Sequence, residues 1–262
     1  MSNRYQAAFA ALNAKQQGAF VPFVTIGDPG LEVSFNIIKT LVENGADALE
    51  LGFPFSDPLA DGPVIQESGA RAIENGMSIE LLFDQLKSLR PTIQLPVVLM
   101  GYMNPVLQYG FEKFCTAAAA VGVDGLILPD MPAYEFEATY GAIVKKYGLD
   151  FIFLVTPETP TERIQYLDSL SSGFLYAVSA SATTGSALNF DAVDTYLQKL
   201  KQMQLINPIL VGFGVKDAAS FELASRHTAG AIIGSAYIKA LENSTDVTAT
   251  TAQFLSSVIG QS

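Results

Sequence analysis

Apolar residues recur along the chain as short, largely apolar runs. They occupy residues 19–26, 48–51, 96–100, 125–128, 151–155, 174–178, 208–211 and 231–233. Longer segments between them return apolar residues every three to four positions, the spacing of an amphipathic helix. Continuous rather than alternating apolar strands indicate a parallel sheet that is covered on both faces. The pattern therefore predicts eight strand–helix units.

An extra helix is predicted ahead of the first strand. Residues 4–16 carry Tyr5, Phe9 and Leu12 at helical spacing. Eight strand–helix units at intervals of roughly 30 residues close into a (β/α)₈ barrel, and an open, doubly wound sheet is the alternative. No linker or change of composition divides the chain, so we expect one domain over residues 1–262.

Composition bears on the class of protein and on its location in the cell. The chain is 49% hydrophobic with a mean hydropathy of +0.29, which suits a sheet buried on both sides. No apolar stretch reaches the ~18 residues that span a bilayer, and residues 4–16 are too polar for a secretory signal. The single Cys115 cannot form an internal disulfide, and we expect it to be a buried apolar residue. We expect a cytoplasmic protein.

The net charge also bears on the partners. It is −11, and the chain contains no basic run. Nucleic acids and anionic membranes bind to positively charged surfaces. The charge therefore argues against both as partners.

The most informative stretch for chemistry is the loop after the second predicted strand, residues 50–63. Glu50 lies at the end of this strand, and a loop rich in proline and glycine leads to Asp61. Catalytic groups of (β/α)₈ barrels lie at the C-terminal ends of the strands. Two acidic groups brought together in a pocket there could transfer protons.

Glu50 stands in apolar surroundings, next to Leu49 and Leu51, and no lysine or arginine lies between Lys39 and Arg71. Desolvation without a local cation raises the pKa of a carboxyl group toward the range of a general acid or base. The alternative is a structural carboxylate that is paired with a neighbouring cation.

For Asp61, a purely structural role is as well supported by the sequence as a functional one. It begins an Asp-Gly-Pro sequence, and an aspartate at such a place often accepts backbone N–H bonds in a turn or at a helix start.

Glycine clusters after the last three predicted strands suggest an anion site. They lie at residues 183–186, 212–214 and 234–235. Barrels often bind phosphate with the loops after strands seven and eight and a helix N-terminus. Between residues 174 and 210 the only cations are Lys199 and Lys201. We therefore expect backbone N–H groups rather than ion pairs to hold the phosphate.

Several kinds of catalysis are disfavoured by the residues that are absent. The only histidine, His227, lies near a helix end, where we expect it on the surface. One histidine and one cysteine make no first-row metal cluster, and no lysine lies in a predicted strand to form a Schiff base. What remains is acid–base chemistry by carboxylates, on a phosphorylated substrate that supplies its own electron sink.

The stretch at residues 50–63 closely resembles the signature of the tryptophan synthase α subunit. Residues 20–25, 27–29, 99–105 and 212–215 resemble the same family, so the likeness runs the full length. It implies cleavage of indole-3-glycerol phosphate to indole and glyceraldehyde 3-phosphate. It also implies an α2β2 complex with a β subunit that carries pyridoxal phosphate, and no cofactor in this chain.

The resemblance also assigns roles to residues. Glu50 handles the proton at C3 of the indole and the glycerol hydroxyl, while Asp61 accepts from the indole N–H. The residues implied to bind phosphate are Gly185, Gly214, Gly234 and Ser235, and those implied to flank the indole ring are Phe23, Leu154, Tyr176 and Phe213. The alternative for the ring-flanking residues is plain barrel core.

Two loops are implied to move or to meet the partner. Thr184 falls in the segment that resembles the family's mobile lid, where Ala182 replaces a glycine that is common in the family. Residues 54–58 and 104–105 are expected to face the β subunit, or else to be solvent-exposed turns.

Two other functions stay open. The chain could be a stand-alone lyase that releases indole, or a phosphate-binding barrel whose task is to activate a partner. The presence of both Glu50 and Asp61 weighs against the second, because a purely allosteric barrel needs neither.

Overall fold

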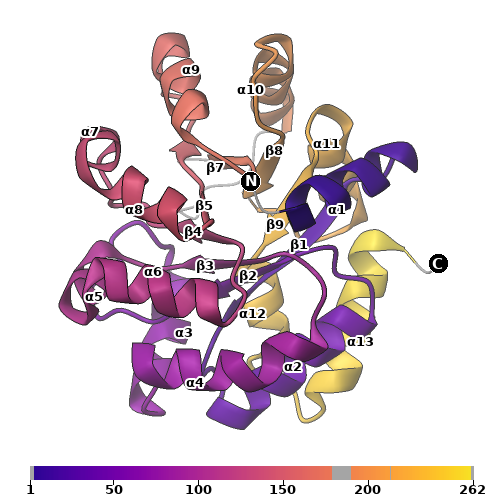
Figure 1. The fold of residues 1–262 in the computed structure, drawn as a ribbon. Helices are drawn as coiled ribbons and strands as arrows, with labels where there is room; N and C mark the ends of the chain where they lie inside the picture. Colours follow the sequence, from indigo (N-terminus) through magenta and orange to yellow (C-terminus); the bar gives the residue numbers. More distant parts are fainter. Residues whose placement is uncertain (1–2, 179–189, 213, 261–262) are drawn as a thin grey trace.

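The computed structural model describes residues 3–178, 190–212 and 214–260. Its strands form one parallel sheet in the order β5-β4-β3-β2-β1-β9-β8-β7-β6 (Figure 1). They are β1 (Ala19–Thr25), β2 (Leu49–Gly52), β3 (Val97–Met100), β4 (Gly125–Ile127), β5 (Asp150–Phe151), β6 (Leu154–Val155), β7 (Leu175–Val178), β8 (Ile209–Gly212) and β9 (Gly230–Ile233).

The barrel closes at one short segment of chain. The single strand expected at residues 151–155 is split into β5, which pairs with β4, and β6, which pairs with β7. The backbone between them continues the hydrogen bonding, because Ile152 N donates to Leu126 O and Tyr176 N donates to Phe153 O, both at 3.0 Å. The two ends of the sheet order therefore meet, and the fold is the (β/α)₈ barrel rather than the open sheet.

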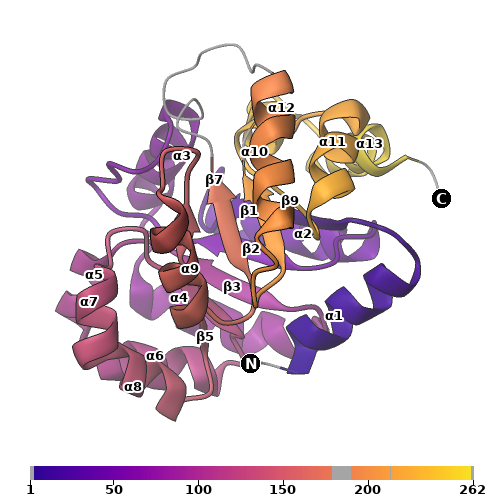
Figure 2. The same cartoon turned by 90° about the horizontal axis from the view of Figure 1, so that it is seen from above.

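Helices surround the strands on the outside (Figures 1 and 2). They are α1 (Asn3–Ala14), α2 (Leu31–Glu43), α3 (Pro63–Glu74), α4 (Ile79–Leu89), α5 (Met103–Tyr109), α6 (Phe111–Ala120), α7 (Ala133–Glu135), α8 (Gly141–Lys146), α9 (Thr161–Leu170), α10 (Phe190–Gln202), α11 (Ala218–His227), α12 (Ser235–Leu241) and α13 (Val247–Ile259), with short turns η1 (Arg90–Thr92) and η2 (Phe136–Tyr140). None of the helices within the described ranges is long and apolar enough to cross a bilayer.

One predicted helical stretch is broken in two, and one helix lies where none was predicted. The material expected at residues 64–89 forms α3 and α4, separated at Gly76, whose φ is +86°. The apolar spacing at residues 109–120 predicts one helix there, which is α6, and the unpredicted α5 precedes it; Gly110, with φ +98°, ends α5 and begins α6. Glycine adopts a positive φ without the steric cost that other residues incur, so these positions end one helix and turn the chain into the next.

The core has an outer and an inner part, as expected for a covered barrel. Along β1, Phe20 and Val24 pack in the cluster between sheet and helices, whereas Val21 and Phe23 belong to the cluster inside the barrel. Alternate strand residues point to opposite faces, which explains the division. Cys115 is fully buried in the outer cluster, as predicted.

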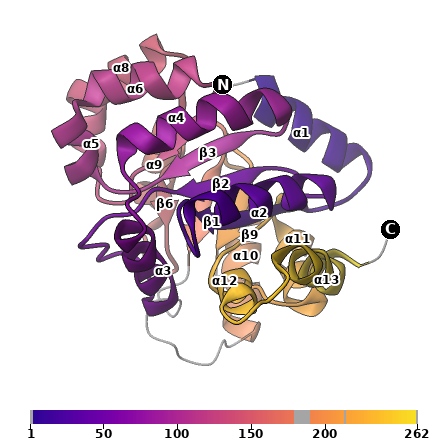
Figure 3. The same cartoon turned by 90° about the horizontal axis from the view of Figure 1, so that it is seen from below.

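Helix α1 covers the N-terminal end of the barrel (Figure 3). The ring of Tyr5 packs edge-on against Phe174, with 5.7 Å between the ring centroids. At the same end, Arg4 Nη1 lies 2.9 Å from Asp124 Oδ1. The extra N-terminal helix therefore closes the end opposite the one where barrel active sites lie.

His227 differs from its expected surface position. It is the last residue of α11, is mostly buried, and its Nε2 lies 2.9 Å from Asp194 Oδ1 on α10. The two helices are adjacent in the barrel, so a polar partner that is distant in sequence holds the imidazole.

Asp124 is the centre of a buried polar cluster. Its Oδ2 accepts from Arg90 Nη2 and from the backbone N–H of Val97, both at 2.8 Å. The Arg90 side chain is 5% exposed. Because a buried guanidinium without its carboxylate is strongly destabilising, this pair ties the start of β3 to the segment before β4.

We expect Asp124→Asn to lower the free energy of unfolding by about 3 kcal/mol, because it leaves the charge of Arg90 buried and uncompensated. The measurement is urea denaturation followed by circular dichroism. Arg4→Gln removes the half-exposed partner of the same aspartate and should cost less than about 1 kcal/mol. Equal losses in the two variants would contradict a special role for the buried pair.

Candidate active site

A cavity of about 330 Å³ opens at the C-terminal ends of the strands. Its wall includes the ends of strands from around the barrel, among them Phe23 of β1, Glu50 of β2, Met100 of β3, Leu154 of β6, Tyr176 of β7, Gly212 of β8 and Ile232 of β9. Asp61 reaches the same cavity from the loop after β2. The two carboxylates singled out in the sequence therefore share one pocket.

Glu50 is buried inside the barrel. It pairs in register with Phe23 on one side and Val98 on the other, and its residue is 1% exposed. Neither carboxylate oxygen has a hydrogen-bond partner among the residues that the structure describes. Burial, and then the charge of Asp61, raise the pKa of Glu50 to about 8. This is the raised pKa that the apolar sequence around Glu50 led us to expect.

Asp61 is held by the hydroxyl group of Tyr102. That hydroxyl accepts from the backbone N–H of Ala60 at 3.0 Å and donates to the carboxylate of Asp61. Burial raises the pKa of Asp61 to about 6, although the hydrogen bond from Tyr102 lowers it. The N-cap of α3 is Gly62, and no side chain caps it. The helix-start alternative for Asp61 therefore finds no support in this geometry.

Tyr102 is a functional candidate that the sequence analysis did not single out. It follows β3 as the N-cap of α5, is itself buried, and its ring lies 5.5 Å from that of Phe55. Only its position directly after a strand could have pointed to it. Tyr102 can reach Asp61 because the strands that they follow, β3 and β2, are paired in the sheet.

Three of the four predicted ring-flanking residues line the cavity: Phe23, Leu154 and Tyr176. Glycines make room for two of them. A Cβ on Gly212 would lie 2.3 Å from the Tyr176 ring, and one on Gly52 would lie 2.5 Å from the Phe23 ring. Both contacts are far shorter than van der Waals distance. The fourth residue, Phe213, lies outside the described residues.

Three of the four predicted phosphate-binding residues also line the cavity: Gly214, Gly234 and Ser235. Gly185 lies outside the described residues, as do Thr184 and Ala182. Two lysines that the sequence analysis passed over, Lys216 and Lys239, line the same cavity. Both lie beyond residue 210, so the scarcity of cations between residues 174 and 210 did not bear on them. Each follows one of the glycine clusters by a few residues.

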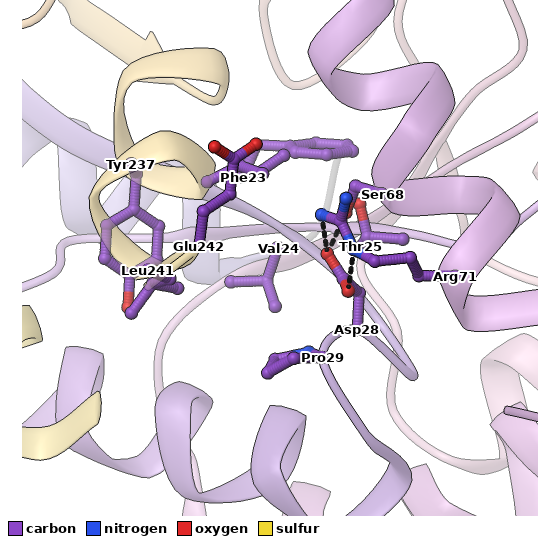
Figure 4. A pocket seen from close by; sticks show the side chains of 11 residues that line it. Phe23, Val24, Thr25, Asp28, Pro29, Ser68, Arg71, Tyr237, Leu241 and Glu242 are labelled. Carbon is purple, nitrogen blue, oxygen red and sulfur yellow. Dashed lines mark hydrogen bonds and ion pairs between the residues drawn. The ribbon is translucent and has the colours of Figure 1, made fainter. Parts of the chain in front are cut away.

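A second, smaller cavity of about 160 Å³ lies behind the active site, between β1, α3 and α12 (Figure 4). Neither Glu50 nor Asp61 lines it, whereas Phe23 lines both cavities. At its edge Asp28 accepts from Arg71 Nε at 2.7 Å and from Arg71 Nη2 at 2.8 Å (Figure 4). This ion pair fastens α3 to the loop after β1, and α3 begins two residues after Asp61.

The site suits acid–base chemistry. Within the described ranges no three histidine, cysteine or acidic side chains gather as a metal site would require. Two carboxyl groups with separated pKa values face one apolar cavity, so at neutral pH one is protonated and the other is ionised. Such a pair can donate a proton at one point of a substrate and stabilise a positive charge at another.

Comparisons with known proteins agree with this geometry. The family model described as "Tryptophan synthase alpha chain" matches residues 9–261. The tryptophan synthase alpha chain of Flavobacterium psychrophilum is 48% identical over 220 residues, 84% of this chain and 87% of that protein. A crystal structure of tryptophan synthase subunit alpha from Legionella pneumophila superposes with a TM-score of 0.88 at 33% identity, covering 97% of this chain and 95% of that one.

A chain in the structure of Mycobacterium tuberculosis tryptophan synthase superposes with a TM-score of 0.87 at 31% identity, covering 97% of both chains. Family model, curated relative and solved structures thus agree over nearly the whole length. The chain belongs to the tryptophan synthase alpha chain family.

Proposed function

We propose that Glu50 and Asp61 perform the lyase reaction of this family, the cleavage of indole-3-glycerol phosphate to indole and glyceraldehyde 3-phosphate. The observation that carries the assignment is the buried, unpartnered Glu50, which faces the cavity with a pKa of about 8. A carboxyl group that is protonated at neutral pH can act as a general acid.

The proposed reaction begins with proton transfer from Glu50 to C3 of the indole. The ring then becomes an iminium-like electron sink, so the bond from C3 to the glycerol chain breaks without a lysine or a metal. The electrons of the broken bond remain on the indole, while the glycerol hydroxyl loses its proton and becomes the aldehyde. Glu50 accepts that proton and ends the cycle as it began.

Asp61 supports the charged intermediate in this proposal. With a pKa of about 6 it is ionised at neutral pH. It accepts a hydrogen bond from the indole N–H, and its negative charge stabilises the positive charge that the ring acquires. Tyr102 fixes the carboxylate where this interaction is needed.

The remaining residues bind the two ends of the substrate. Phe23, Leu154, Tyr176 and Phe213 are proposed to flank the indole ring, and Gly185, Gly214, Gly234 and Ser235 to bind the phosphate with backbone N–H groups. Thr184 is proposed to belong to a lid. The positions of Phe213, Gly185 and Thr184 in this scheme rest on the family resemblance, because all three lie outside the described residues.

We further propose a β subunit as partner, with pyridoxal phosphate on that subunit and none on this chain, and a cytoplasmic location. Apolar side chains at the rim of the barrel support the partner. Leu59 is 90% exposed, Leu107 48% and Tyr134 68%. They follow β2, β3 and β4, which are neighbours in the sheet, so they lie on one side of the rim beside residues 54–58 and 104–105. Clustered exposed apolar groups mark interaction surfaces.

Glu50→Gln should fold normally and bind an indolyl phosphate, while its turnover falls by at least about 10³-fold, because an amide cannot donate and then recover the proton. The test is release of indole from indole-3-glycerol phosphate, with circular dichroism to verify folding. Glu80→Gln, which makes the same change at an exposed position of α4 away from the cavity, is the control. Turnover near that of the unmodified chain would remove Glu50 from the proposed role.

Asp61→Asn tests the division of labour through the pH profile of kcat/KM. In the unmodified chain the profile should be bell-shaped. Activity falls below about pH 6 as Asp61 gains a proton, and above about pH 8 as Glu50 loses the proton that it must donate.

In Asp61→Asn the rate should fall and the acidic limb due to residue 61 should vanish. The alkaline limb should move to lower pH, because the charge of Asp61 contributes to the raised pKa of Glu50. The substrate phosphate also titrates near pH 6, so the shift of the alkaline limb is the decisive readout. An unmoved alkaline limb would show that the two carboxylates are not coupled.

Leu107→Asp tests the partner surface. We expect it to weaken binding of a purified β subunit by about tenfold or more, since it places a charge in a buried apolar contact, while activity without the subunit is unchanged. The measurement is the concentration of β subunit that gives half of the maximal stimulation. Ile206→Asp is the control, because Ile206 is 73% exposed just before β8, at the opposite end of the barrel. A chain that is fully active alone and never co-elutes with the β subunit would favour the stand-alone lyase.

A further inference from the structure

Two positively charged side chains line the catalytic cavity, and the proposed function gives them no role. Lys216 and Lys239 both line it, together with Gly214, Gly234 and Ser235. Lys216 follows β8 and stands two residues after Gly214, while Lys239 lies in α12, four residues after Ser235. Both lysines therefore come from the segments that follow the last two strands, and both accompany the glycines there.

Helix geometry brings Lys239 back toward Ser235. Residues four apart lie on the same face of a helix, with about 5–6 Å between their Cβ atoms. Each Cα–Cβ bond also tilts toward the helix N-terminus, so a long side chain extends over the preceding turn. The ammonium group of Lys239 can thus reach the start of α12, where the chain leaves β9.

Neither lysine is committed to another group within the described part of the chain. The ion pairs found there involve Arg4, Arg71, Arg90, Lys146, Arg226 and His227, but not Lys216 or Lys239. Asp217, the neighbour of Lys216, caps α11 by accepting from the backbone N–H of Ser220 at 2.9 Å. Two exposed ammonium groups beside a cavity remain available to a ligand.

The overall charge of the chain gives these lysines a task. A net charge of −11 repels a doubly charged phosphate ester on approach. Glu50 and Asp61 add acidic groups to the same cavity. A pair of cations at one place on its wall attracts the anionic end of a substrate there, and so determines which end faces the carboxylates.

We propose that Lys216 and Lys239 bind the phosphate dianion of the substrate and thereby set its orientation in the cavity. This inference rests on the proposed function for the identity of the substrate, but it concerns binding and orientation rather than the proton transfer. It also modifies the expectation that backbone N–H groups alone hold the phosphate. Lysine suits this role because its ammonium group is a compact charge on a flexible chain.

An alternative role for each lysine is structural. Lys239 stands in the last turn of α12, where a cation favours the helix dipole, and Lys216 could simply be solvated. A structural role would change stability and leave the recognition of phosphate unaffected. The two roles therefore differ in a quantity that binding measurements report.

The test compares Lys216→Gln, Lys239→Gln and the double variant with the unmodified chain. We expect KM for indole-3-glycerol phosphate to rise about threefold for each single change and about tenfold for the double change, with kcat within twofold. The dependence of kcat/KM on salt should flatten in the double variant, because fewer charges attract the substrate. Lys216→Arg and Lys239→Arg should keep most of the affinity.

Lys199→Gln is the matched control, since it removes the same charge from an exposed position on α10 that does not line the cavity. Equal KM values in the double variant and in Lys199→Gln would overturn the proposal. So would a loss of apparent kcat that matches a loss of folded protein while KM stays unchanged, since that is the result of a structural role.

Titration with inorganic phosphate, followed by phosphorus NMR, separates this proposal from the proposed function. Weaker phosphate binding in the lysine variants would support the lysine assignment even if the unmodified chain released no indole, a result that would overturn only the proposed reaction. Unchanged phosphate binding in the double variant of a chain that does release indole would overturn only the lysine assignment.

Discussion

The chemistry of this barrel depends on one unfavourable arrangement, a carboxyl group enclosed without a hydrogen-bond partner among the residues that the structure describes. Leaving a charged carboxylate out of water and away from cations costs several kcal/mol, so the group keeps its proton instead. The register of β2 between β1 and β3 places Glu50 there, between Phe23 and Val98. The parallel barrel, rather than a loop, thus creates the acid.

Asp61, the second carboxylate, lies on a loop rather than on a strand. This contrast explains how two similar groups can differ in function. Asp61 sits on a loop and depends on a hydrogen bond from Tyr102, a residue of the next strand–helix connection. That bond favours the ionised form, while burial opposes it. One carboxyl group is set by the strand register and the other by a cross-loop contact, so their pKa values are pushed apart.

Much of the fold could be predicted from the sequence because its signals are local. Continuous apolar runs and helical spacing suffice to place strands and helices in order. The split of residues 150–155 into β5 and β6 could not be predicted, because it reflects a change of hydrogen-bond partner from β4 to β7. The same holds for His227, whose partner Asp194 lies on another helix.

The residues of the site differ in the same way: some could be predicted from the local sequence and others could not. Glu50 could be found because its lack of a cation was visible in the nearby sequence, whereas the weight of Asp61 depended on which residue caps α3. Tyr102 matters through Asp61, which is remote in sequence, and Lys216 and Lys239 come to one cavity only because β8 and β9 are neighbours in the sheet, so residue order alone did not reveal them. Their roles depend on the closed sheet.

The glycines at the ends of β2 and β8 carry a consequence for how this protein can vary. Gly52 and Gly212 leave the space that the rings of Phe23 and Tyr176 occupy. A larger residue at either position is compatible with the barrel only if the facing ring becomes smaller, and a smaller ring alone leaves a void beside the carboxylates. Substitutions at each glycine and at its facing ring are therefore coupled. A change at one position is tolerated chiefly alongside a compensating change at the other.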